Sequence, residues 1–193
     1  MNKQITFSQY RLIDLGMMAG LLVLSQAVIY LASSRLFPDQ LYVVSPVAAI
    51  VAIVMMRWDW RAVLHALLGG AVFCWLSGGR WEHYLIYCVG NAASLAALLL
   101  FRLLGKKRIR SDTFLSLTFA LCVQLAMQLG RAALAAALGF GGPACLRFIT
   151  TDLLSELFTL FIVWIVRRQD GLFEDQKQYL LRVQSERQIE GRE

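Results

Sequence analysis

Charged residues are scarce in this chain. Of its 193 residues, 17% are charged and 58% are hydrophobic, and the mean hydropathy is +0.58. Soluble globular domains carry about 25% charged residues and about 45–50% apolar residues. The shortage of charge therefore argues against a disordered chain and against most soluble enzymes. It predicts a small integral membrane protein.

Histidine, proline and paired cysteine are also in short supply. Two histidines are too few for a multi-histidine metal centre, and three prolines are few for a long structured loop. None of the cysteines forms a C-x-x-C pair, so neither a zinc site nor a redox dithiol is indicated. Cys74, Cys88, Cys122 and Cys145 are expected to be buried as small apolar side chains. A disulfide among Cys74, Cys88 and Cys145 is the alternative.

The chain lacks the motifs of the common catalytic sites. It contains no G-x-S-x-G, H-E-x-x-H, Walker or G-x-G-x-x-G sequence. Asp152 and Glu156 imitate a carboxylate pair, but no nucleophile or metal ligand accompanies them. His65 is expected to be a packed side chain. We therefore expect no enzymatic activity, no metal site and no cofactor.

Long apolar runs are abundant. A helix needs about 20 mainly apolar residues to cross about 30 Å of hydrocarbon. Polar, glycine-rich or proline-rich intervals divide the chain into six apolar segments, at residues 12–34, 42–56, 62–76, 84–104, 114–138 and 148–166. The pattern predicts an all-α membrane fold with six transmembrane helices in one bundle. Six spans are preferred to four or five, although the second and third segments are short.

Basic residues predict the orientation, because short cytoplasmic loops accumulate Lys and Arg. The intervals expected on the inner side hold Lys3, Arg11, Arg57, Arg61, Arg102, Lys106, Lys107, Arg108, Arg110, Arg167 and Arg168. The opposite intervals hold Arg35, Arg80 and Arg147. Both termini are therefore predicted to be cytoplasmic in a multi-pass protein of the cell membrane. The net charge of +6 is interpreted as a topology signal, and no nucleic-acid partner is expected.

Polar residues recur at helical spacing in the fifth and sixth segments. Such residues usually face the interior of a membrane bundle. Gln124, Gln128 and Arg131 share one face of the fifth, and Asp152 and Glu156 share a face near the start of the sixth. At about 1.5 Å per residue, Arg131 and Asp152 reach a similar depth in the outer half. An ion pair is predicted there, either as a staple between helices or as part of a ligand site.

A second polar stripe enters the fourth segment from the same side. His83, Tyr87, Asn91 and Ser94 follow helical spacing, and Trp81 lies in the glycine-containing loop before them. An aromatic rim over a polar, inward-facing pocket is typical of a small-molecule site. The predicted ligand-binding residues are Trp81, His83, Tyr87, Asn91, Gln128, Arg131, Asp152 and Glu156.

Small residues in the first segment predict a close helix contact. Gly16, Ala19 and Gly20 include a G-x-x-x-G sequence, which lets two membrane helices approach closely. This face packs either within the chain or against another membrane protein. We treat it as the candidate docking surface for a membrane partner.

The chain resembles the substrate-binding S components of energy-coupling factor (ECF) vitamin transporters. The likeness lies in the six spans, the small-residue first helix and the polar outer pocket. Ser45-Pro46, Trp58, Trp60 and Gly69-Gly70 are similar to the family's proline-and-glycine region. The resemblance implies a protein that captures a vitamin or other small nutrient from outside. A membrane coupling protein with ATPase subunits would supply the energy for its delivery.

The last part of the chain supports an alternative function. Residues 1–168 are predicted to form the transmembrane domain, and residues 169–193 a cytoplasmic tail. Phe173, Tyr179, Leu180 and Val183 are spaced compatibly with an amphipathic helix, although a solvated helix is an equal alternative. A tail that docks cytoplasmic partners is expected of a non-catalytic membrane scaffold or sensor of the MreD-like kind.

Overall fold

The computed structural model describes residues 6–36 and 44–190, and this part of the chain is helical without any β-strand. The first half contains α1 (Phe7–Leu36), α2 (Val47–Trp58), the 3-10 turn η1 (Asp59–Arg61) and α3 (Ala62–Leu76). A continuous helical stretch follows, made of α4 (Trp81–Tyr84), η2 (Leu85–Val89), α5 (Gly90–Ala92), η3 (Ala93–Leu98) and α6 (Leu99–Leu104). The second half contains α7 (Lys106–Ser111), α8 (Thr113–Ala137), α9 (Gly142–Thr150), α10 (Leu153–Val166) and α11 (Gln176–Glu190).

Four helical stretches of the described chain are long and apolar enough to cross a membrane. They are Phe7–Leu36, Trp81–Leu104, Thr113–Ala137 and Gly142–Val166. The all-helical, membrane-embedded character predicted from the sequence is confirmed at this level. At 1.5 Å per residue, α2 and α3 are only about 18 Å and about 23 Å long, so they do not qualify by length. The predicted start of the second segment, Tyr42, lies outside the described residues.

The short helix α2 forms the centre of the bundle. All of its residues from Val47 to Trp58 are buried, and it packs against α1, α3, α8 and α10. Its sequence is apolar on every side except for Arg57 near its end. A helix that is hydrophobic all round is expected to be enclosed by other helices. Its burial therefore follows from its composition.

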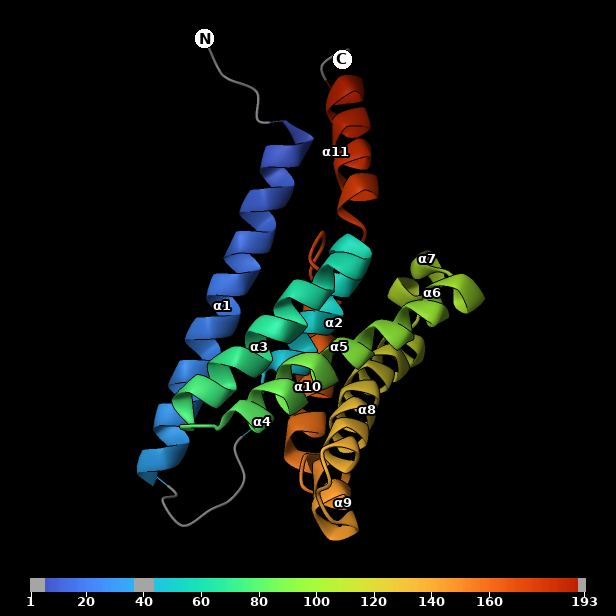
Figure 1. Cartoon of the computed structure of the whole chain (residues 1–193). Helices are drawn as coiled ribbons and strands as arrows, with labels where there is room; N and C mark the ends of the chain where they lie inside the picture. Colours follow the sequence, from blue (N-terminus) through green and yellow to red (C-terminus); the bar gives the residue numbers. More distant parts are fainter. Residues whose placement is uncertain (1–5, 37–43, 191–193) are drawn as a thin grey trace.

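The bundle has two distinct ends. Figure 1 shows the start of α1, α7 and α11 together at one end, which we call the α11 end, and α4 and α9 at the other, the α9 end. Arg57 contacts Gly171, and Arg167 contacts the α7–α8 junction, so predicted inner-side cations gather at the α11 end. Arg80 immediately precedes α4 and Arg147 belongs to α9, and both of these helices lie at the opposite end. Lys3, another predicted inner-side cation, lies outside the described residues.

Two helical stretches depart from regular α geometry near the α9 end. The stretch from Trp81 to Leu104 contains a π-helical turn at Leu85–Val89 and a 3-10 segment at Ala93–Leu98. The predicted sixth helix is divided into α9 and α10 by a break at Thr151 and Asp152. Such π turns often occur at functional sites. The π turn and the break at Thr151 and Asp152 border the cavity described next.

Candidate ligand-binding site

A cavity of about 100 Å³ lies inside the bundle, toward the α9 end. Its walls come from the start of α2, the second half of α3, the irregular stretch around Tyr87, the later part of α8 and the α9–α10 junction. The lining residues are Ser45, Val47, Gly69, Gly70, Phe73, Tyr87, Asn91, Arg131, Thr151 and Asp152. Helices distant in sequence therefore contribute to one polar enclosure within an apolar bundle.

Arg131 is the central polar residue of this cavity. It is only 6% exposed. Its Nε donates to Asn91 Oδ1 at 2.7 Å, and its Nη1 donates to Asp152 Oδ2 at 3.0 Å. The guanidinium also lies 5.0 Å from the centre of the Tyr87 ring, which is cation–π geometry. The predicted ion pair between Arg131 and Asp152 is confirmed.

Asn91 is held in place from its other side. Its Nδ2 donates to the Ala66 carbonyl oxygen of α3 at 3.1 Å, which leaves Oδ1 to accept from Arg131. Gly90 allows α5 to come close to α8, because a Cβ at this position would lie 2.8 Å from Arg131 Cα. The orientation of Asn91 is therefore determined by both α3 and α8.

Glycines make the α3 wall of the cavity possible. A Cβ on Gly69 would lie 2.8 Å from Val47 Cγ2, and one on Gly70 would lie 2.7 Å from the Cys88 amide nitrogen. Gln26 of α1 donates to the Gly69 carbonyl oxygen at 3.2 Å and fixes the backbone there. Side chains at these two positions would therefore separate α3 from α2 and from the π turn.

Aromatic rings cover one side of the cavity. The Tyr87 ring lies 4.6 Å from the Phe73 ring and 5.8 Å from the Phe148 ring, measured between ring centres. These three residues belong to α3, η2 and α9. We call them the aromatic cover. A ligand arriving from the α9 end would meet this cover next to Arg131.

Gln128 and Glu156 form a second pair that does not line the cavity. Gln128 Nε2 donates to Glu156 Oε1 at 2.9 Å. Gln128 is fully buried, and its Oε1 has no hydrogen-bond partner within the described part of the chain. Gln128 lies one turn before Arg131 in α8, so the pair extends the polar contacts toward the centre of the bundle.

Trp81 and His83 lie apart from the other predicted site residues. They line a separate surface hollow of about 330 Å³ with Arg80, Glu82, Leu138 and Phe140. Trp81 is 63% exposed, and His83 Nδ1 accepts a hydrogen bond from the Arg80 amide at 3.1 Å. Of the predicted residues, the cavity thus brings together Tyr87, Asn91, Arg131 and Asp152.

Part of the lining was not predicted from the sequence. The unpredicted lining residues are Ser45, Val47, Gly69, Gly70, Phe73 and Thr151. Ser45 and the two glycines were noted only for the family resemblance. Phe73 follows Gly69 by four residues and so shares its helical face, which was an available signal. Thr151 immediately precedes the predicted Asp152.

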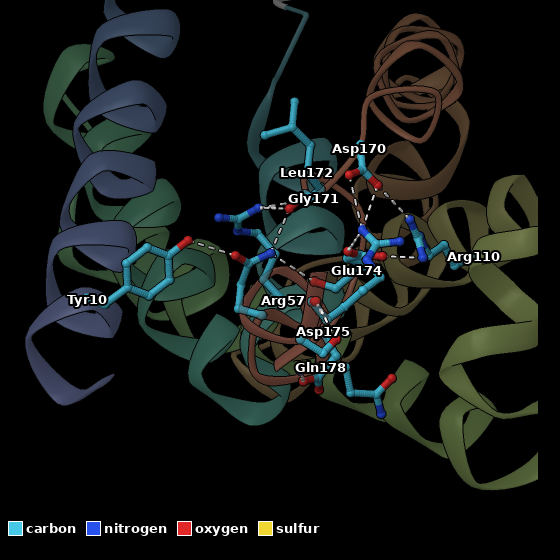
Figure 2. Close-up of polar contacts among 12 residues, drawn as sticks. Tyr10, Arg57, Arg110, Asp170, Gly171, Leu172, Glu174, Asp175 and Gln178 are labelled. Carbon is cyan, nitrogen blue, oxygen red and sulfur yellow. Dashed lines mark hydrogen bonds and ion pairs between the residues drawn. The ribbon is translucent and has the colours of Figure 1, made fainter. Parts of the chain in front are cut away.

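A polar cluster at the α11 end was also not predicted. Asp14 of α1 is 2% exposed and accepts hydrogen bonds from Arg57 and Trp58. Arg57 Nη1 in turn donates to the carbonyl oxygens of Gly171 and Leu172, at 2.7 and 3.1 Å. Figure 2 shows this contact beside a group of ion pairs around Asp170 and Glu174. The segment before α11 is therefore anchored to the bundle.

The small residues of α1 lie on its outward side. Gly16 and Gly20 are exposed, and a Cβ added to either would have no atom within 4 Å. Ala19 is half-buried. The G-x-x-x-G face thus forms no close contact within the described part of the chain.

The chain matches no protein-family model, no curated protein sequence and no solved structure.

Proposed function

We propose that this protein is a non-catalytic membrane subunit that binds a small nutrient, such as a vitamin, and delivers it across the cell membrane. The observation that carries the proposal is the polar cavity at Arg131. A staple between two helices needs only the ion pair. Here the paired charges border open space together with Tyr87, Asn91 and Thr151. A concave site with few, convergent polar groups is typical of ligand binding.

The proposed topology has six spans, with both termini in the cytoplasm. The concentration of basic residues at the α11 end supports this orientation. It directs the α9 end, and with it the cavity, to the outside. The enclosed helix α2 and its neighbour α3 would then complete the bundle between the four longer spans. The ligand would enter past the aromatic cover.

The size of the cavity restricts what binds in this conformation. Sites for drug-sized ligands usually have volumes of about 300–1,000 Å³, whereas this cavity has about 100 Å³. A vitamin would therefore insert one end beside Arg131, or the aromatic cover would move outward. Phe148 belongs to α9. Because the residues of α9 are exposed or only half-buried, much of the surface of this helix is not tightly packed.

The energy for transport would come from partner proteins. No catalytic motif accompanies the site, so an ECF-type coupling protein with ATPases is the proposed partner. The outward G-x-x-x-G face of α1 supports a membrane contact of this kind, because exposed glycines permit close approach of another helix.

Retention of the natural ligand tests the proposal. Native mass spectrometry of the purified protein should detect a bound small molecule. The double variant Arg131→Met with Asp152→Asn should lose it, whereas Arg80→Met with Glu82→Gln should keep it. The control pair is the exposed ion pair of α4, which lies at the same end of the bundle. Equal retention by both double variants would refute the cavity as the binding site.

A membrane scaffold of the MreD-like kind is the second candidate. One observation favours it: a largely apolar groove of about 350 Å³ separates the start of α1 from α11. It is lined by Phe7, Tyr10, Lys177, Leu180, Leu181 and Gln184. Co-purification distinguishes the two functions, because a transporter subunit should bring ATPases and a scaffold should bring cell-wall or division proteins.

A further inference from the structure

The ion pair in the cavity leaves hydrogen-bonding groups unused on both of its side chains. In the hydrogen bonds among the described residues, Arg131 donates through Nε and Nη1, and Asp152 accepts through Oδ2. Arg131 Nη2 and Asp152 Oδ1 take no part in them. Both side chains line the cavity. A ligand in the cavity can therefore reach one side chain that still donates and one that still accepts.

The charges of the cavity lining cancel. Among the lining residues that the structure describes, Arg131 and Asp152 are the only ones with a formally charged side chain, and they form an ion pair of 3.0 Å. Glu156 lies one turn further along α10. It does not line the cavity, and its Oε1 accepts a hydrogen bond from Gln128. A ligand with a net charge would add an uncompensated charge inside an apolar bundle, which is unfavourable. The lining thus selects against simple anions and cations.

A carboxamide or ureido group matches the remaining donor and acceptor. Its carbonyl oxygen can accept from Arg131 Nη2 while its N–H donates to Asp152 Oδ1, and the protein's own ion pair stays intact. A zwitterion would compete with that pair for both partners and would need two charged groups to be dehydrated. The volume of about 100 Å³ is several times the roughly 10–15 Å³ that a single water molecule needs in a cavity. An amide group fits such a space.

We propose that the cavity recognises net-neutral solutes through a terminal carboxamide or ureido group, held by Arg131 Nη2 and Asp152 Oδ1. This inference rests on the proposed binding function and names its ligand class. The rest of the solute would extend past Phe73, Tyr87 and Phe148 toward the α9 end.

Small probes of matched size test the ligand class. Saturation-transfer NMR on the full chain in detergent would compare acetamide and 2-imidazolidinone with acetate, methylammonium and glycine. Each probe is used at about 10 mM, because fragments of so few atoms bind weakly. We expect saturation transfer from the protein to acetamide and 2-imidazolidinone, and none to acetate, methylammonium or zwitterionic glycine. The affinity for the two neutral probes, measured by titrating the saturation transfer, should fall at least about tenfold in the Arg131→Met, Asp152→Asn variant, a loss of about 1.4 kcal/mol.

Two further variants serve as controls for folding and for the binding position. The protein with Arg80→Met and Glu82→Gln should bind the neutral probes as the natural chain does. Thr151→Leu fills the cavity while it keeps the Arg131–Asp152 pair, so it should abolish the signal even where the charge variant folds poorly. Binding of acetate, methylammonium or glycine that Thr151→Leu abolishes would overturn the inference. Absence of any probe binding would also overturn it.

The same samples separate this inference from the proposed function. If the protein retains its natural solute but binds no neutral probe, the proposed binding function stands and the proposed ligand class is wrong. If it retains no solute and binds no probe, both proposals are wrong.

Discussion

Arg131 is the residue on which the cavity depends. A charged side chain in the hydrocarbon core costs from about 2.5 kcal/mol upward. The structure compensates for it with the Asp152 carboxylate, the Asn91 carbonyl and the face of Tyr87. Since Asn91 is itself held by the Ala66 carbonyl oxygen, the guanidinium has little freedom to reorient. The polar groups of the cavity are thus held in fixed positions by contacts within the protein.

Removing one member of the ion pair should destabilise the protein strongly. Arg131→Met leaves Asp152 as an uncompensated charge, and we expect a loss of about 3–5 kcal/mol in the free energy of unfolding. The double variant Arg131→Met with Asp152→Asn should recover much of it. Denaturation in detergent, followed by circular dichroism, measures both. Arg80→Met is the control, since its exposed pair with Glu82 contributes at most about 1 kcal/mol. A double variant as unstable as the single one would contradict a buried pair.

The residues that sequence analysis placed correctly share a simple property. Arg131 and Asp152 are charges within apolar runs, so counting along each helix was enough to predict that they meet. His83 was grouped with Tyr87 and Asn91 by regular α spacing, but the π turn at Leu85–Val89 takes more residues per turn. Regular α spacing counted across this turn therefore no longer predicts which residues share a face of the helix. This turn depends on tertiary packing and has no marker in the sequence.

At the scale of elements, α5 and α8 approach each other closely. A Cβ on Gly90 would meet the Arg131 backbone, and one on Gly130 would meet the Gly90 carbonyl oxygen. These glycines were not singled out from the sequence, because a glycine in an apolar run does not reveal which helix it faces. The contact brings Asn91 within hydrogen-bond distance of Arg131.

Gly90→Ala should disturb this contact. The added Cβ forces α5 away from α8, and overpacking of this kind costs about 1–3 kcal/mol. We expect a lower midpoint of thermal unfolding and weaker retention of the ligand. Gly16→Ala is the matched control, since its Cβ would enter open space and alanine favours a helix by up to about 1 kcal/mol. Equal effects of the two changes would show that the close approach is unimportant.

The attachment of α11 should depend on pH. Arg182 donates to both Asp170 carboxylate oxygens, at 2.8 and 3.1 Å, and this hydrogen bonding holds the pKa of Asp170 below its ordinary value. A lowered pKa means that Asp170 stabilises the folded contact at pH values above its unfolded pKa. The stabilisation disappears as the pH falls through the folded pKa. The contact should therefore be constant near neutral pH and weaken below about pH 4.

A spin-label distance between α7 and α11 measures this dependence. The distance distribution of the natural sequence should broaden only in acid. Asp170→Asn should show a broadened distribution already at neutral pH, with a smaller further change in acid. Glu186→Gln, an exposed change on the same helix, should behave like the natural sequence. A distribution that stays narrow at pH 3 would argue that Phe173 and Arg57 alone hold the segment.

At the scale of the whole molecule, the two ends differ in chemistry. The α11 end contains the buried Asp14–Arg57 pair and the ion pairs of the segment before α11. The α9 end carries the aromatic cover and leads to the cavity. The helical content and the apolar spans followed from composition. The anchoring of residues 171–176 did not, because Phe173 was assigned to an amphipathic tail helix and nothing in the sequence indicated that Glu174 and Gln176 are buried.

This asymmetry predicts opposite accessibility of the two ends in cells. A single cysteine at Lys107, in α7, should react only with membrane-permeant maleimides. One at Gly141, which precedes α9, should react with impermeant reagents added from outside. The four natural cysteines are first replaced by serine or alanine. Because Figure 1 places α7 and α9 at opposite ends of the bundle, labelling of both positions from one side is incompatible with a membrane-spanning arrangement along this axis. If the cysteine at position 107 reacts with impermeant reagents and the one at position 141 does not, the fold is still consistent with the labelling, but the cavity faces the cytoplasm. That result would contradict capture of a nutrient from outside.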